Sequence, residues 1–185
     1  MKQQFTMALV LICLFGCSAW IAPVYADGNA NFLYGAKGLN EDDWAPVEDQ
    51  VVYGLMADFK PADWPVAIAT DLIFSSENTG YAGTTVEGST SEFDLGVRWY
   101  SNAVNNVRFY AGGGLARIAG EFEAYNMTDS DEAFGLWIDT GIVLTLKTHF
   151  NLGVDLRYSK AQIDLFGINT EAGGLLVGVF AGLKF

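Results

Sequence analysis

The chain has 185 residues, enough for one domain, and carries a formal net charge of −12 at pH 7. It lacks the clustered lysine and arginine residues that bind phosphates, which argues against a nucleic-acid partner. A cationic partner or divalent cations would suit this charge better. The favoured interpretation, however, is that the acidic residues only keep the loops of an exported protein soluble and hydrated.

Residues 1–26 have the pattern of a secretory signal peptide, with a basic Lys2, an apolar core over 5–21 and small residues before a cleavage site after Ala26. A lipoprotein signal with a lipidated Cys17 and an uncleaved membrane anchor are the alternatives. Cys13 and Cys17 both lie in this segment. The expected mature domain, 27–185, therefore contains no disulfide, zinc–thiolate site or cysteine nucleophile.

The mature chain repeats a pattern in which apolar residues occupy every second position, as in strands with one apolar face. We expect eight strands of about ten residues, the length that crosses a bilayer when tilted. A run of glycines at 112–114 predicts a bend or a bulge in the fifth strand. The expected strands are 31–40, 50–59, 66–75, 92–100, 107–115, 136–145, 150–159 and 173–185.

The connections between these strands alternate in length. Long loops are expected at 41–48, 76–91, 119–132 and 160–172, and short turns at 60–65, 101–106 and 147–149. Transmembrane barrels of the outer membrane have short periplasmic turns and longer external loops. A soluble lipocalin-type barrel is the alternative, but it would place its apolar faces inside.

Aromatic residues near the expected strand ends fit two girdles at the membrane interfaces. The inner girdle would hold Trp64, Trp99, Phe109 and Phe150, and the outer girdle Phe74, Phe93 and Tyr158. Other aromatic residues in the long loops could contact a partner or pack the loops onto the barrel rim; these are Trp44, Tyr81, Tyr125 and Phe166.

The last strand alternates apolar residues from Leu175 to the terminal Phe185. A final strand that ends on an aromatic residue resembles the C-terminal signature of bacterial outer-membrane β-barrels, and the mature chain resembles the outer-membrane-protein-A-like or OmpW-like family. This resemblance implies a monomeric, all-β, eight-stranded antiparallel up-and-down transmembrane barrel in the cell outer membrane, among lipid and lipopolysaccharide. It also implies insertion by the barrel-assembly machinery, with Phe185 as part of the recognition signal, and no cofactor.

Charged residues occupy the face opposite the apolar one and would point into the lumen. The lumen of an eight-stranded barrel is narrow and filled by side chains, so buried charges there must pair. Asp139 should lie opposite Arg157, with Asp155 and Asp71 nearby. The lumenal candidates are Asp71, Asp94, Arg98, Arg108, Asp139, Asp155 and Arg157, together with Lys37, Asp58, Glu92 and Lys184. A structural plug is the favoured interpretation, and a proton or ion pathway the alternative.

An enzymatic interpretation rests on a similarity to lipid A deacylases, whose motif places a histidine two residues before a serine, with a glutamate further on. Ser159 and Glu171 have this spacing, but Arg157 stands where the base should be and does not lose its proton. The only histidine, His149, falls in an expected periplasmic turn. We therefore assign no catalytic residue, and expect no enzyme.

The sequence contains no P-loop, dinucleotide fingerprint or HExxH motif, and its acidic loops lack the ligand spacing of an EF-hand. These loops could still bind divalent cations that bridge lipopolysaccharide phosphates. The favoured function is a structural or surface-interaction role with a filled lumen. The alternatives are a transport barrel for small or hydrophobic solutes and, less favoured, a lipid-modifying enzyme.

Overall fold

The computed structural model describes residues 27–185, apart from residues 82, 126 and 148 and the side chain of Tyr81. The expected signal peptide, with Cys13 and Cys17, lies outside the described residues.

Eight long antiparallel strands form a closed barrel, which confirms the predicted fold class. Strands that follow one another pair with one another, and the last strand pairs with the first, so the sheet has no free edge. The barrel strands are β1 (Asp27–Gly38), β2 (Asp49–Lys60), β3 (Ala67–Tyr81), β4 (Thr84–Tyr100), β5 (Val107–Ala124), β6 (Met127–Leu146), β7 (Phe150–Lys160) and β10 (Gly174–Lys184).

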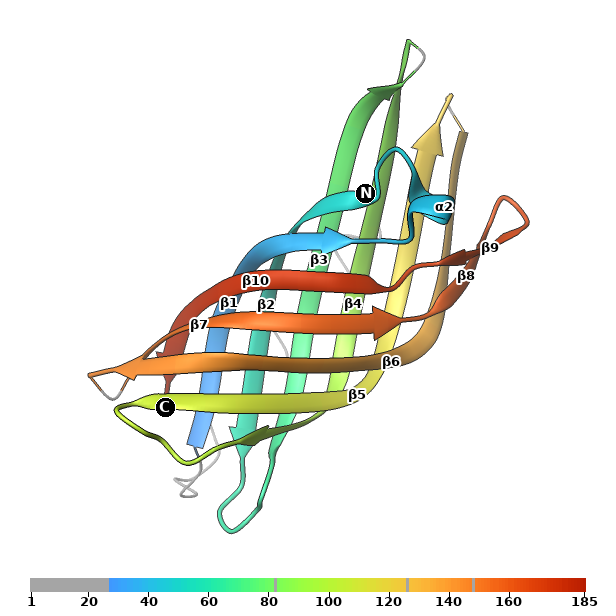
Figure 1. The fold of residues 1–185 in the computed structure, drawn as a ribbon. Coiled ribbons are helices and arrows are strands. Elements are labelled where there is room, and N and C mark those ends of the chain that lie inside the picture. The colour runs from blue at the N-terminus through green and yellow to red at the C-terminus, as the bar shows by residue number, and fades with distance from the viewer. Residues whose placement is uncertain (1–26, 82, 126, 148) are drawn as a thin grey trace, which may run out of the picture.

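The two ends of the barrel differ (Figure 1). Three short turns, at 61–66, 101–106 and 147–149, lie at the end that we call the short-turn end, where the chain also finishes beside the start of β1. The opposite, long-hairpin end carries the tips of the β3–β4 and β5–β6 hairpins. It also carries the short helix α2 (Glu41–Trp44) and a small hairpin made by β8 (Gln162–Leu165) and β9 (Ile168–Glu171).

Two predicted loops, 76–91 and 119–132, are wrong, because most of their residues continue the strands. The β3–β4 ladder runs as far as Tyr81 opposite Thr84, and the β5–β6 ladder as far as Ala124 opposite Met127. The Gly, Ser and Thr content of 76–91 resembles a loop, but Thr and Val also favour strands, and Gly83 makes the tight turn at a φ of +83°. The first strand likewise begins at Asp27 rather than at 31.

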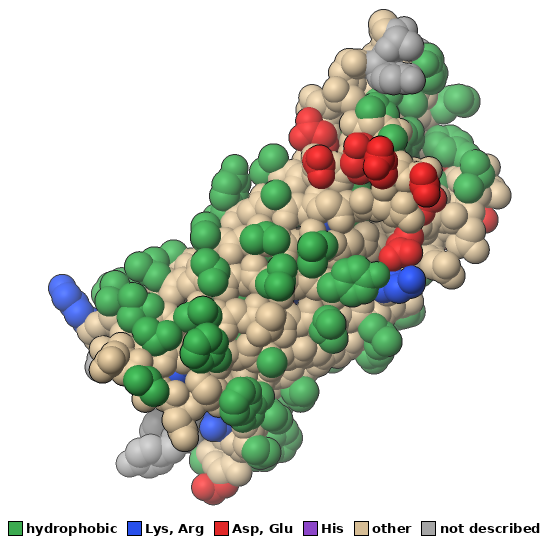
Figure 2. All heavy atoms as spheres, viewed as in Figure 1, with side chains coloured by type: hydrophobic (Ala, Val, Ile, Leu, Met, Phe, Trp, Pro, Cys, Tyr) green, Lys and Arg blue, Asp and Glu red, His purple; other side chains and the backbone are tan. Residues whose placement is uncertain are grey.

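The alternation of apolar and polar residues places the apolar side chains on the outside of the barrel. Phe32, Leu115 and Leu136 are more than half exposed, whereas Leu33, Ala116 and Trp137, the residues that follow them on β1, β5 and β6, are buried in the lumen. Hydrophobic side chains are spread over the body of the barrel in Figure 2. An apolar surface this continuous is unfavourable in water and suits a bilayer.

The glycine run of β5 produces a bend and not a bulge. Gly112, Gly113 and Gly114 keep the register with both β4 and β6, without an inserted residue. β5 and β6 bend strongly along their length (Figure 1). A Cβ at Gly112 would lie 2.5 Å from Asp139 Oδ1, so this glycine leaves room for a lumenal carboxylate.

Candidate functional site in the barrel lumen and at its mouth

The lumen holds two buried arginines from opposite parts of the barrel wall, Arg98 on β4 and Arg157 on β7. Five aspartates surround them, and all seven residues are at most 5% exposed. We call this group the central charge cluster; its members are Asp58, Asp71, Asp94, Arg98, Asp139, Asp155 and Arg157.

Arg98 binds two aspartates from different strands. Its Nη2 donates to Asp71 Oδ2 at 2.8 Å and to Asp139 Oδ2 at 2.6 Å, and its Nε donates to Asp139 Oδ2 at 3.0 Å. Its Nη1 lies 3.6 Å from Asp58 Oδ2. These contacts reach across the lumen from β4 to β2, β3 and β6.

Arg157 binds the same two aspartates from the other side. Its Nη2 donates to Asp71 Oδ2 at 2.5 Å and to Asp139 Oδ2 at 3.3 Å, and its Nη1 donates to Asp94. Its Nε lies 3.6 Å from Asp155 Oδ2. Asp139 stands directly opposite Arg157 in the β6–β7 register, the position expected from a turn centred near residue 148.

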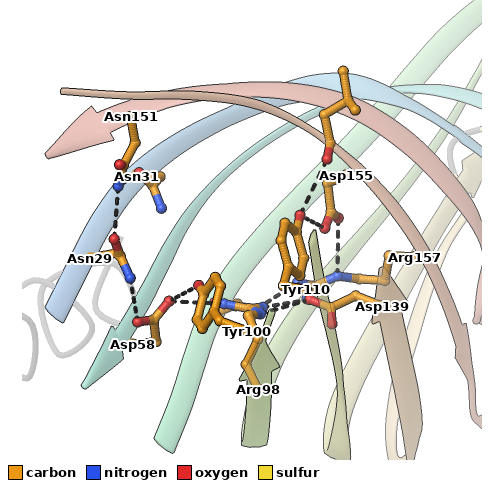
Figure 3. Close-up of polar contacts among 12 residues, drawn as sticks. Asn29, Asn31, Asp58, Arg98, Tyr100, Tyr110, Asp139, Asn151, Asp155 and Arg157 are labelled. Atoms are coloured by element: carbon orange, nitrogen blue, oxygen red, sulfur yellow. Dashed lines mark hydrogen bonds and ion pairs between the residues drawn. The ribbon is translucent and has the colours of Figure 1, made fainter. Parts of the chain in front are cut away.

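Aromatic side chains hold the cluster in place. Tyr100 donates to Asp58 and Tyr110 donates to Asp155, both at 2.5 Å (Figure 3). The Arg157 guanidinium lies 4.9 Å from the centroid of the Trp137 ring, at which distance the cation is attracted to the face of the ring. Charged and aromatic groups thus occupy the middle of the lumen together.

A second polar group lies closer to the long-hairpin end. Lys37 forms an ion pair with Glu92, and Ser159 donates to Glu92 Oε1 at 3.0 Å. The predicted similarity to deacylases does not extend to the geometry, because the Ser159 hydroxyl points to Glu92. Glu171 instead contacts Tyr158 and Lys160.

The mouth at the long-hairpin end is filled by Trp44. Asn40 caps the short helix α2 by accepting from the Asp42 N–H at 3.0 Å, and this helix presents Trp44 to the lumen, where it is 0% exposed. The indole Nε1 donates to the carbonyl oxygen of Glu171 at 2.8 Å. We call the segment 39–48, with Trp44 at its centre, the plug loop.

The walls of the mouth are shaped to accept this indole. A Cβ at Gly120 would lie 3.1 Å from Trp44 Cη2 and 2.6 Å from Ile163 Cδ1, and a Cβ at Gly88 would lie 2.6 Å from Val47 Cγ2. Of the two roles that the sequence allows for Trp44, the structure shows packing. Tyr125 and Phe166 stay exposed at the hairpin tips.

The remaining lumenal volume is lined by apolar side chains. One buried group surrounds the plug and includes Ile118, Trp137 and Ile163; the other includes Leu33, Met56 and Phe180. Charges, aromatic rings and aliphatic side chains together pack the lumen along its length.

Two charged residues expected in the lumen lie at its edge instead. Arg108 is only half-buried, with its guanidinium 4.8 Å from the centroid of the Tyr100 ring. Lys184 is also half-buried and lies 3.6 Å from Asp27. Both residues belong to the short-turn end, and Nη2 of Arg108 is buried there without a hydrogen-bond partner.

Two aspartates of the protruding part of β6 hold the β8–β9 hairpin. Asp131 Oδ2 accepts from the backbone N–H of Asp164 at 2.8 Å, and Asp129 Oδ2 accepts from the N–H of Phe166 at 2.5 Å. Hydrogen bonds from the backbone N–H groups of Asp164 and Glu132 lower the pKa of the Asp131 carboxyl. These carboxylates satisfy backbone donors on an otherwise unpaired strand edge.

Among the described residues, no group of three or more acidic, histidine or cysteine side chains is arranged to hold a metal ion. In the same part of the chain, no helix is long and apolar enough to cross a membrane.

A closed barrel with an apolar outer belt, short turns at one end and long hairpins at the other is the architecture of small outer-membrane β-barrels. No protein-family model matches the chain, and no curated protein does.

Solved structures share this fold at low sequence identity. The neisserial surface protein A superposes with a TM-score of 0.62 at 12% identity, over 86% of this chain and 97% of that one. Ail, the attachment invasion locus protein of Yersinia pestis, gives 0.57 at 13% identity, over 86% and 99%. The N-terminal β-barrel domain of Pseudomonas aeruginosa OprF gives 0.54 at 15% identity, over 85% and 97%.

These similarities confirm the predicted resemblance to small outer-membrane barrels at the level of the fold. All three are outer-membrane or surface barrels, which agrees with the predicted location of this chain in the outer membrane.

Proposed function

We propose that this protein is a monomeric outer-membrane barrel with a closed lumen, and that it works through contacts made at its long-hairpin end. The observation that carries this proposal is the packed lumen, in which the central charge cluster and the plug loop fill the space that a solute would need. The protein would then have a structural role and bind a partner at the surface, and it would not be an enzyme.

The charge at the long-hairpin end indicates the chemistry of a partner. Acidic side chains gather there in Figure 2, and the basic ones described on the same surface are Arg117, which pairs with Glu132, and Lys160. The exposed acidic residues are Glu41, Asp42, Asp49, Glu87, Glu121, Glu123, Glu132 and Asp164. Such a surface favours a cationic polypeptide, whose approach its field would accelerate.

The apolar residues at the hairpin tips would supply contact area. Tyr125, Met127 and Ile168 are each more than half exposed, and they lie among acidic neighbours. Apolar centres with a charged rim are typical of protein interfaces. We therefore expect a partner that combines basic and apolar residues.

One structural neighbour binds a ligand of the opposite charge to the partner proposed here. A structure of Ail contains the heparin analogue sucrose octasulfate, and it superposes here with a TM-score of 0.58 at 13% identity. A polyanion would be repelled by the acidic end of this chain. We propose that this protein does not share that ligand chemistry.

The proposal is tested with the refolded protein in lipid nanodiscs and a labelled peptide of lysine and leucine residues. Glu121→Gln, Glu123→Gln and Asp164→Asn together should weaken binding by about tenfold at low salt, and added salt should weaken wild-type binding as well. The matched control neutralises Asp27 and Asp63 at the other end, and should leave binding unchanged. Equal loss in both variants, or binding of sucrose octasulfate, would contradict the proposal.

Assembly into the outer membrane forms a second part of the proposal. Phe185 is exposed, and its backbone pairs with Gly28 through bonds of 2.8 and 2.9 Å. An exposed aromatic residue on the closing strand is available to the barrel-assembly machinery before closure. After insertion, lipid and lipopolysaccharide would surround the apolar belt.

A further inference from the structure

The buried carboxyl groups of the lumen outnumber its buried cations. Among the described residues, the lumenal acids that are at most 5% exposed are Asp58, Asp71, Glu92, Asp94, Asp139 and Asp155. The lumenal cations buried to the same degree are Lys37, Arg98 and Arg157. A lumen with every group ionised would hold an excess of negative charge.

The contacts show which carboxylates the cations neutralise. Lys37 pairs with Glu92, and the two arginines share Asp71 and Asp139. Asp58, Asp94 and Asp155 make up the rest. Arg157 also donates to Asp94 and lies 3.6 Å from Asp155, but three cations can offset only three of the six carboxylates.

Asp58 differs from the other two because both of its oxygens accept hydrogen bonds. Asn29 donates to Oδ1 at 2.7 Å and Tyr100 donates to Oδ2 (Figure 3). Neutral donors of this kind stabilise an ionised carboxylate. Asp58 is therefore the member of the three best suited to remain charged.

Asp94 and Asp155 each keep one buried oxygen without a hydrogen-bond partner, as do Asp71, Glu92 and Asp139, whereas Asp58 has none. Asp94 binds Arg157 through Oδ2 alone, and Asp155 accepts from Tyr110 through Oδ1 alone. The indole N–H of Trp137, 1% exposed and stacked on Arg157, is also unpartnered. Unmatched acceptors and a donor thus lie in the same buried cluster.

The neighbours of Asp94 add negative charge. Asp71 faces it directly across the β3–β4 ladder, Glu92 precedes it on the same face of β4, and Arg157 approaches from β7. Like charges placed directly opposite one another on paired strands are unfavourable.

Asp155 faces Tyr110 from β5, Arg157 on its own strand and the charges of Asp139 and Arg98. Arg157 lies closer to Asp71 and Asp139 than to Asp155. Arg98 binds the same two aspartates.

We propose that Asp94 and Asp155 bind protons at neutral pH, so that the centre of the lumen is a proton-binding site. Burying more carboxylates than the neighbouring cations can offset is so costly that the excess groups take up protons instead. A metal ion is the other way to neutralise the excess, but no described acidic group is arranged to hold one. The site goes beyond the proposed function, because it does not depend on the partner at the long-hairpin end.

The test uses the full refolded chain in lipid vesicles and the infrared absorption of protonated carboxyl groups at pH 7. The wild type should show this absorption, Asp94→Asn and Asp155→Asn should each remove part of it, and the control Asp164→Asn, at an exposed residue, should leave it intact. Its absence from folded wild-type protein would overturn the proposal.

Stability as a function of pH gives a second readout. At pH 7 the unfolded chain has released the protons that the folded lumen holds, because ordinary aspartates titrate near pH 3.9. Raising the pH should then destabilise the wild type, since the folded state binds more protons. The double variant Asp94→Asn, Asp155→Asn should lose this dependence. A wild type whose stability follows added Na⁺ or Ca²⁺ instead of pH would contradict proton binding.

Discussion

At the scale of single residues, two arginines show how burial changes the value of an ion pair. Arg157 is buried among four aspartates, whereas Arg117 pairs with Glu132 at 2.5 Å while both side chains are about half exposed. Removing one partner of a buried pair leaves uncompensated charge, but an exposed pair contributes little.

We therefore expect Arg157→Met to lower the free energy of unfolding by about 3–5 kcal/mol at neutral pH, and Arg117→Met by less than about 1 kcal/mol. Urea unfolding in vesicles, followed by tryptophan fluorescence, measures both changes. Equal effects of the two substitutions would show that the lumenal pairs carry no special weight.

The terminal Phe185 covers a glycine on the first strand. A Cβ at Gly28 would lie 2.3 Å from the Phe185 ring, so the ring lies directly against the backbone of β1. Deletion of Phe185 should reduce the amount of protein assembled in the outer membrane, while Phe185→Tyr should keep it. Heat-modifiable gel mobility of membrane fractions reports this assembly, and normal yield without Phe185 would rule out its role as a signal.

The lumenal charges could be predicted from alternation, and the contact of Asp139 with Arg157 from the register of neighbouring strands, but the contacts between strands that do not pair could not. Arg157 and Asp94 are 63 residues apart and lie on strands that do not pair with each other. Their contact depends on the reach of long side chains across the lumen, which strand register does not determine. The position of Arg108 at the edge has a similar origin, because alternation sets the face of a residue and not its depth.

At the scale of elements, the eight strands and the turns were predictable because side-chain alternation and turn residues are local signals. The lengths of β3 to β6 were not, because the apolar alternation that marks these strands in the sequence stops before the strands end. Their inner faces are instead stabilised by the plug loop and by Ile163 of β8, contacts that sequence alone does not show.

The plug loop gives a prediction about local stability. Trp44→Ala should remove packing worth about 3 kcal/mol and let segment 39–48 open without unfolding the barrel. Hydrogen exchange of the Leu39 and Val47 N–H groups, bonded to Glu48 and Trp44 carbonyls, should accelerate on the order of 100-fold. Trp64→Ala, in an exposed turn, should leave both rates unchanged; unchanged rates in the Trp44 variant would show that the indole does not hold the loop.

The β8–β9 hairpin should respond to acid through Asp131. The pKa of this carboxyl is lowered in the folded state, so its stabilising bond is complete above the unfolded value of about 3.9 and is lost as the pH falls through the lowered value. The amide resonance of Asp164 should shift with this titration, and Asp131→Ala should abolish the shift. A resonance that is insensitive between about pH 5 and pH 2 would contradict the bond.

At the scale of the whole molecule, the chain separates three environments. An apolar belt faces lipid, the lumen holds buried charges among packed side chains, and the acidic residues gather at the long-hairpin end (Figure 2). Because side chains pack the lumen, we propose that the exposed ends carry the function. This assignment depends on the lumen being closed.

Single-channel conductance of the refolded protein in a planar bilayer tests that closure most directly, once circular dichroism has shown the β structure. We expect no resolved openings from the wild type. Trp44→Ala should also stay silent, because the central charge cluster still fills the lumen behind the plug loop. Steady openings from correctly folded wild-type protein would contradict a closed barrel and would favour transport of small solutes.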